Sequence, residues 1–156
     1  MIEIERKFLV KTNDFKSLAT SSVFIKQAYL CKDPHRTVRI RIKDQQAFLT
    51  IKGISNASGM SRFEWEKELP LKEGEMLLKL ALPTVIVKTR YIVPQETLSF
   101  EVDVFEGDHK GLILAEIELP NEEALIDLPH WIGKEVTGDK RYYNSYLSSI
   151  ESKKSL

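Results

Sequence analysis

The 156-residue sequence lacks the features that mark several large classes of protein. Its single cysteine, Cys31, cannot form a disulfide within the chain, so we expect a reducing compartment. The first seven residues already carry four charges and contain no apolar stretch typical of a secretory signal. No apolar run approaches the ~20 residues that a membrane-spanning helix needs. We therefore expect a cytoplasmic protein that does not enter a membrane.

The sequence also lacks an excess of charge of either sign. Its 23 basic and 23 acidic residues cancel, so general electrostatic attraction to a nucleic acid is not expected. The 7 glycines and 6 prolines are scattered and mark no linker. A chain of this length fits one domain, which we expect over 1–150, with a frayed tail at 151–156.

Segments rich in β-branched and aromatic residues alternate with turn-forming residues and predict eight strands. These strands fall at about 2–10, 23–32, 36–43, 46–52, 61–69, 84–93, 96–105 and 112–119. Helical patterns are present at about 13–19, 72–80 and 138–150, with a short helical turn near 121–126. This order favours a mainly β fold, an eight-stranded antiparallel barrel with short covering helices and a C-terminal helix.

Seven of the eight predicted strands carry charge on one face and apolar side chains on the other, because alternate residues of a strand share a face. A solvated charged face is the usual explanation for any single strand. Here, however, the charges are sorted by sign: strands 36–43 and 84–93 are basic, whereas 61–69, 96–105 and 112–119 are acidic. Like charges two residues apart repel and gain nothing on an exposed surface. The sorting therefore favours a barrel with a polar interior and an apolar exterior.

The charged faces supply six cations and eight anions to this predicted interior. The cations are Lys7, Arg39, Arg41, Lys52, Lys88 and Arg90, and the anions are Glu3, Glu5, Glu64, Glu66, Glu101, Asp103, Glu116 and Glu118. Enclosing so many charges is unfavourable unless each finds a partner. A polyphosphate with divalent cations would satisfy both sets, because Arg and Lys bind phosphate oxygens and carboxylates bind Mg²⁺ or Mn²⁺.

Eight ordered motifs resemble those of the CYTH superfamily, also called triphosphate tunnel metalloenzymes, and in particular its bacterial inorganic triphosphatases. The first is EIERK at 3–7, which matches the ExExK signature, and the others are RIR at 39–41, TIKG at 50–53, FEWE at 63–66, VKTR at 87–90, EVD at 101–103, AEIE at 115–118 and EVTGD at 135–139. The resemblance implies an eight-stranded barrel whose tunnel binds a triphosphate with a divalent metal. It assigns the six cations to the triphosphate and assigns metal most securely to Glu3, Glu5, Glu116 and Glu118.

The reaction that we expect is metal-dependent hydrolysis of tripolyphosphate to pyrophosphate and phosphate. The cations would orient the phosphate chain, and a metal would lower the pKa of an attacking water. Glu3 or Glu5 is then a metal ligand or general base, Lys88 is a further catalytic candidate, and Tyr29 is either a proton donor to the leaving oxygen or a structural residue.

Several alternatives stay open at this point. They are a class IV-type adenylyl cyclase, a thiamine or nucleoside triphosphatase, and a non-catalytic polyphosphate-binding module. A small-molecule triphosphate is the expected partner, and a homodimer is one option for assembly.

Overall fold

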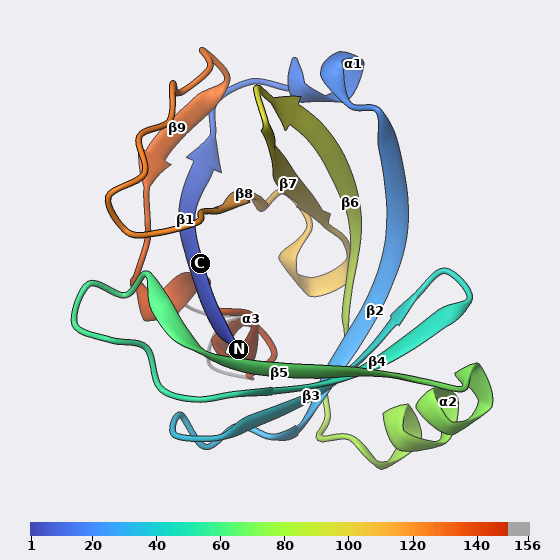
Figure 1. The fold of residues 1–156 in the computed structure, drawn as a ribbon. Helices are drawn as coiled ribbons and strands as arrows, with labels where there is room; N and C mark the ends of the chain where they lie inside the picture. The colour runs from blue at the N-terminus through green and yellow to red at the C-terminus, as the bar shows by residue number, and fades with distance from the viewer. Residues whose placement is uncertain (150–156) are drawn as a thin grey trace.

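The computed structural model describes residues 1–149 as a closed eight-stranded antiparallel barrel with a ninth strand outside it (Figure 1). In chain order the elements are β1 Ile2–Val10, α1 Phe15–Leu18, β2 Ser21–Cys31, β3 Thr37–Lys43, β4 Gln46–Lys52, β5 Ser61–Leu69, α2 Leu71–Leu80, β6 Ile86–Gln95, β7 Leu98–Phe105, η1 Gly107–His109, β8 Ile113–Glu118, β9 Ile132–Glu135, η2 Lys140–Tyr142 and α3 Asn144–Leu147. The tail expected at 151–156 lies outside the described residues. None of the helices in residues 1–149 combines the length and apolar character needed to cross a membrane.

Strand β1 closes the barrel by dividing its length between two partners. The sheet runs β5-β4-β3-β2-β6-β7-β8-β1, and β1 pairs with β8 over Glu5–Leu9 and with β5 over Ile2–Ile4. Closure leaves these eight strands without a free edge and fixes which side chains point inward. The added strand β9 pairs with the far end of β1, opposite Phe8 and Val10.

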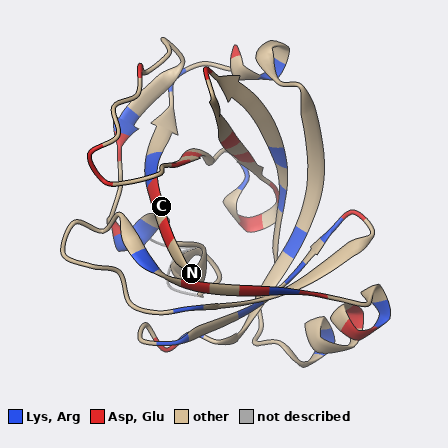
Figure 2. Cartoon of the chain, in the orientation of Figure 1, with Lys and Arg blue, Asp and Glu red and all other residues tan. Residues whose placement is uncertain are grey.

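The register across the barrel brings the charged faces of neighbouring strands together (Figure 2). Lys7 of β1 lies opposite Glu116 of β8, and Glu116 lies opposite Glu101 of β7. Arg90 of β6 lies opposite Asp103 of β7. The prediction of a charged face on most strands is thus confirmed, and that face is turned to the interior.

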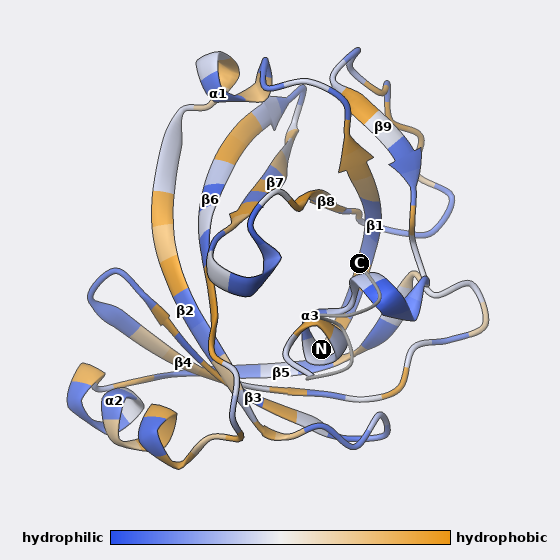
Figure 3. Cartoon of the chain, turned by 180° about the vertical axis from the view of Figure 1, so that it is seen from behind, coloured by the Kyte–Doolittle hydropathy of each residue, from blue (hydrophilic) through white to orange (hydrophobic). Residues whose placement is uncertain are grey.

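The larger part of the hydrophobic core lies outside the barrel wall, on the opposite faces of the same strands. Phe8 and Phe100 point outward from β1 and β7 and pack with Trp131 and Phe15, and the Phe100 and Trp131 ring centroids are 5.3 Å apart. β9, α1 and the connection at 119–131 cover this side, whereas α2 covers β3 and β4 (Figures 1 and 3). A second, smaller apolar cluster fills the interior at the end where α3 lies, and its members are Ile86, Phe105, Leu114, Val136 and Leu147. The rest of the interior is free to carry charge.

Two parts of the predicted secondary structure are wrong. The helix expected at 138–150 is replaced, in its described part, by the 3₁₀ turn η2 and the one-turn helix α3, because the extended backbone of Tyr143 separates them. The segment 121–126 forms a turn at its start and no helix. The short strand β9 was not predicted, because its four residues become a strand only through pairing with β1.

Replacing Gly74 in α2 with alanine should destabilise the protein, although alanine is the better helix former. A Cβ at position 74 would lie 2.2 Å from the Cβ of Ala47 on β4, so the helix could no longer seat on the sheet. We expect a loss of ~1–3 kcal/mol in urea unfolding, which exceeds the gain in helix propensity. The neighbouring exposed substitution Glu75→Ala should change stability by less than ~0.5 kcal/mol, and equal effects at both positions would contradict this packing.

Candidate functional site

The interior of the barrel contains a cavity of about 190 Å³ that is lined almost entirely by polar and charged side chains. The lining residues come from all the barrel strands and from the segment at α3: Glu3, Glu5, Lys7, Tyr29, Thr37, Arg39, Arg41, Lys43, Thr50, Lys52, Arg62, Glu64, Glu66, Arg90, Glu101, Glu116, Glu118, Tyr143, Asn144 and Ser145. Among the described residues, seven of these are cationic and seven are acidic. The cavity is therefore built for a ligand that carries both kinds of charge.

Most of the residues that the sequence analysis singled out lie on this cavity. Of the fourteen charged candidates and Tyr29, only Lys88 and Asp103 do not line it. Both are buried directly behind the lining, each with 1% of its surface exposed. They therefore form a layer of charge beneath the cavity wall.

Arg39 and Arg41 of β3 form a cationic wall with unused hydrogen-bonding capacity. Both approach Glu66 of β5, with nitrogen–oxygen distances of 3.7 and 3.4 Å, and Glu66 also accepts a hydrogen bond of 2.7 Å from Thr50. The buried Nε atoms of both arginines have no hydrogen-bond partner among the described residues. Burial and the charges of Arg39 and Arg90 lower the pKa of Arg41 to about 10. An anion in the cavity would relieve the repulsion between these guanidinium groups.

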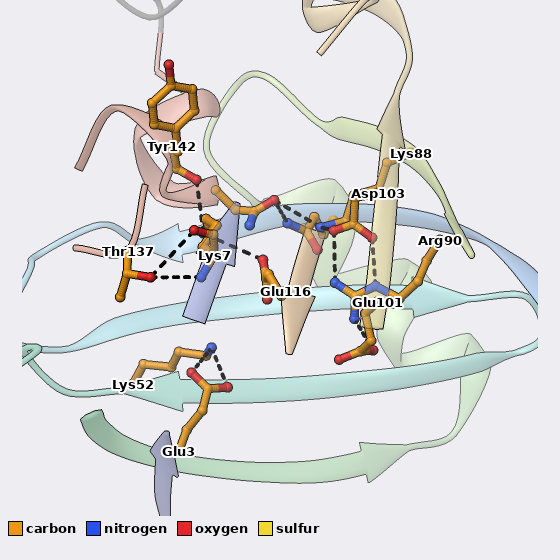
Figure 4. A network of polar contacts seen from close by, with 12 residues as sticks. Glu3, Lys7, Lys52, Lys88, Arg90, Glu101, Asp103, Glu116, Thr137 and Tyr142 are labelled. Carbon is orange, nitrogen blue, oxygen red and sulfur yellow. Dashed lines mark hydrogen bonds and ion pairs between the residues drawn. The ribbon is translucent and has the colours of Figure 1, made fainter. Parts of the chain in front are cut away.

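Asp103 holds two buried cations in place behind the wall (Figure 4). Its carboxylate accepts two hydrogen bonds from Arg90, of 2.7 and 2.9 Å, and lies 2.7 Å from Lys88 Nζ. Burial alone would raise the pKa of Asp103, but the charges of Arg90 and Lys88 outweigh it and lower the pKa. Glu101 accepts a third hydrogen bond from Arg90, of 2.8 Å, from the side of the cavity.

Two further lysines enter the cavity from β1 and β4. Lys52 Nζ lies 2.9 Å from Glu3 and 3.1 Å from Glu64, so it bridges two carboxylates. Lys7 Nζ donates a hydrogen bond of 3.0 Å to the carbonyl oxygen of Tyr142 and lies 3.5 Å from Glu116. Figure 4 shows the Lys52–Glu3 contact and the Lys7–Tyr142 contact as two separate groups.

The acidic wall holds more carboxyl groups than can ionise together. Burial and the charges of Glu116 and Glu3 raise the pKa of Glu5 to about 8. Burial and a hydrogen bond with Glu3 raise the pKa of Glu64 to about 7. Burial would also raise the pKa of Glu3, but its hydrogen bond with Glu64 and the charge of Lys52 lower it to about 2. A cation between these carboxyl groups would offset the repulsion that raises the pKa values of Glu5 and Glu64.

This wall fits a hard divalent cation in its chemistry, because all of its donors are carboxylate oxygens. Among residues 1–149, no three carboxylate, imidazole or thiolate groups already converge on one metal position. The carboxylates would therefore have to move together around an ion, or share it with oxygens of the bound substrate and water.

Sequence reasoning missed several lining residues for two different reasons. Arg62 and Lys43 share strand faces with Glu64 and Arg41, so the alternation that found their neighbours could also have found them. Tyr143, Asn144 and Ser145 come from the segment at α3, and no local pattern there indicates that it reaches the cavity.

Asp103→Ala should unfold more easily than any change at the cavity surface, because it leaves Lys88 and Arg90 buried and without their shared carboxylate. We expect a loss of about 3 kcal/mol or more in urea unfolding. Glu101→Gln, which keeps an acceptor for Arg90 on a partly exposed side chain, serves as the control and should cost under ~1 kcal/mol. A stable Asp103→Ala protein would mean that the two cations find other partners.

Comparison with known proteins places the chain in a recognised group. The family model of the CYTH domain matches residues 1–150. The inorganic triphosphatase of Acetivibrio thermocellus is 46% identical over 146 residues, which cover 93% of this chain and 92% of that protein. The inorganic triphosphatase of Nitrosomonas europaea is 38% identical, with 95% and 97% covered. The solved structure of the inorganic triphosphatase NE1496 superposes with a TM-score of 0.67 at 36% identity and covers 95% of this chain and 99% of that one.

Proposed function

The chain belongs to the CYTH family, and we propose that residues 1–150 act as one catalytic domain that hydrolyses inorganic tripolyphosphate to pyrophosphate and phosphate with a divalent metal ion. Two relatives named inorganic triphosphatase support this activity. The observation that carries the proposal is the pairing of two walls in one cavity. One wall holds Arg39 and Arg41 side by side next to Glu66, and the other holds the closely spaced carboxylates of β1, β5 and β8.

The basic residues bind and orient the phosphate chain. Arg39 and Arg41 present planar guanidinium groups from one strand and suit phosphate oxygens in geometry as well as charge. The other strands supply three further cations that contact the phosphate chain, namely Lys7, Lys52 and Arg90. Lys88, which is fully buried beside them, adds positive charge without lining the cavity. Positioning and charge neutralisation account for most of the catalysis of phosphoryl transfer.

The acidic residues divide between metal binding and support of the cations. Glu3, Glu5, Glu116 and Glu118 would hold Mg²⁺ or Mn²⁺, which when bound neutralises phosphate charge and lowers the pKa of a coordinated water. Glu64 lies beside Glu3 and could join them. The remaining three, Glu66, Glu101 and Asp103, accept hydrogen bonds or ion pairs from arginines and so orient the substrate-binding cations.

Two residues are assigned to proton transfer. Of Glu3 and Glu5, which both line the acidic wall, the one that does not hold the metal ion would accept the proton of the attacking water. Tyr29, which is buried to 6% exposure on β2 and lines the cavity, donates a proton to the leaving oxygen. Tyr29→Phe should then lower kcat about 10²-fold with little change in KM, as measured by phosphate release at saturating tripolyphosphate. An unchanged kcat would leave Tyr29 with a packing role.

Removing one residue from each wall should abolish activity without unfolding the barrel. We expect Glu5→Gln and Arg41→Ala each to reduce phosphate release from tripolyphosphate by at least ~10²-fold. The matched controls are Glu75→Gln on α2 and Arg36→Ala in the β2–β3 turn, both exposed and neither among the lining residues, and these should retain full activity. Full activity in both cavity variants would contradict the proposed site.

The choice of metal and substrate is tested in one set of assays. With tripolyphosphate, EDTA should eliminate phosphate release, and Mg²⁺ or Mn²⁺ should restore it. Pyrophosphate, ATP and thiamine triphosphate should be poorer substrates. Cyclic AMP is measured in the ATP reaction, and its formation in place of phosphate release would identify a cyclase instead of a hydrolase.

A second candidate is hydrolysis of a triphosphate that carries an organic group. A groove of about 790 Å³ adjoins the cavity and shares Thr37, Arg62 and Tyr143 with it. An aromatic side chain at this shared boundary could stack on a base or a thiazole. Equal kcat/KM values for ATP and tripolyphosphate would favour this candidate.

A further inference from the structure

Asn144, the first residue of α3, is placed against the buried lysine of β6 although the two are 56 positions apart in the sequence. Lys88 Nζ donates a hydrogen bond of 3.0 Å to Asn144 Oδ1 and is also paired with Asp103 at 2.7 Å. The segment that carries Asn144 lies within the outline of the barrel in both views of the ribbon (Figures 1 and 3). Asn144 is one of the residues that line the cavity.

The orientation of the Asn144 amide is determined by its two partners. Lys88 can only donate, and Gln27 Nε2 donates a second hydrogen bond, of 2.9 Å, to the same Asn144 oxygen. The amide nitrogen Nδ2 must therefore point away from Lys88 and Gln27. Among residues 1–149 it has no hydrogen-bond partner, and its residue borders the cavity. Two hydrogen-bond donors on Nδ2 are thus available to a ligand.

Gln27 supports this orientation of the Asn144 amide, although its own side-chain oxygen is left without a hydrogen bond among the described residues. Its side chain is fully buried on β2, and its Oε1 atom has no partner among the described residues. Its amide nitrogen is used on Asn144. A buried polar group with one unpaired atom is unfavourable. We therefore infer that Gln27 occupies this position because its amide nitrogen binds Asn144.

The uncharged amide oxygen of Asn144 also accepts a hydrogen bond from Lys88 without cancelling its positive charge. Lys88 is already paired with the carboxylate of Asp103, and a second carboxylate at position 144 would place excess negative charge beside the cavity. An amide satisfies the ammonium group without adding that charge. At the same time its own N–H groups are left to donate to a bound anion.

We propose that Asn144 is a phosphate-binding residue of the cavity, which donates from Nδ2 to a phosphate oxygen of the substrate while Oδ1 positions Lys88. This inference rests on the proposed function, because it takes a phosphate chain as the ligand. It gives the segment at α3 a direct part in substrate binding in addition to covering the barrel. Gln27 acts through Asn144 as a positioning residue.

The test compares substitutions that separate the two sides of the amide. Asn144→Asp keeps an oxygen for Lys88 and Gln27 but replaces the donor with a charged acceptor. Asn144→Ala removes both sides. Asn13→Asp and Asn13→Ala, at an exposed position before α1, are the matched controls. Each protein is titrated with tripolyphosphate in EDTA by calorimetry, its KM and kcat are measured with Mg²⁺, and its thermal unfolding is recorded.

We expect Asn144→Asp to raise Kd and KM for tripolyphosphate about 10- to 100-fold at a wild-type unfolding temperature, since a hydrogen bond to a charged group is lost and repulsion is added. Asn144→Ala should raise both constants less, and the Asn13 variants should match the wild type. A wild-type Kd in Asn144→Asp overturns the proposal, even if Asn144→Ala is unstable. If the wild type binds tripolyphosphate but does not hydrolyse it, the proposed function fails, whereas the calorimetric comparison still decides the role of Asn144.

Discussion

The mutual pairing of charges inside the barrel is the constraint on which the rest of this structure depends. Charged side chains can be enclosed only when each has a partner, and here the closed register brings basic and acidic strands into contact around one cavity. The pairing is incomplete on both walls of the cavity. The arginine Nε atoms lack acceptors among the described residues, and the carboxyl groups lie close enough to repel one another. A ligand with phosphates and metal ions would complete both.

This arrangement requires most of the hydrophobic core to lie outside the barrel. In a small barrel the interior usually supplies the core, but here the outward faces of β1, β6, β7 and β8 pack under β9, α1 and the connection at 119–131. The short covering elements are therefore as necessary to the site as the strands. Without them the outward apolar faces would be exposed, and the closed barrel would lose its main source of stability.

The site includes buried residues that hold the lining residues in position. Asp103 does not reach the cavity, yet it sets the positions of Arg90 and Lys88, and Asn144 approaches Lys88 from the other side. A residue can thus shape the binding surface from behind it. The distinction between lining and supporting residues follows from burial and pairing, which strand alternation alone does not reveal.

The sequence by itself determined the strands, their charged faces and most of the lining residues. These properties are local, because the alternation of side chains along a strand follows from the backbone. Charges sorted by sign are not expected on a solvent-exposed face, so they indicate that the face points to the interior. Only the tertiary structure decided which charged residues line the cavity and which are fully buried, that β9 forms, and where the segment at α3 lies. Those features depend on contacts between residues far apart in the chain, such as Lys7 with Tyr142 and Lys88 with Asn144, and no local pattern encodes them.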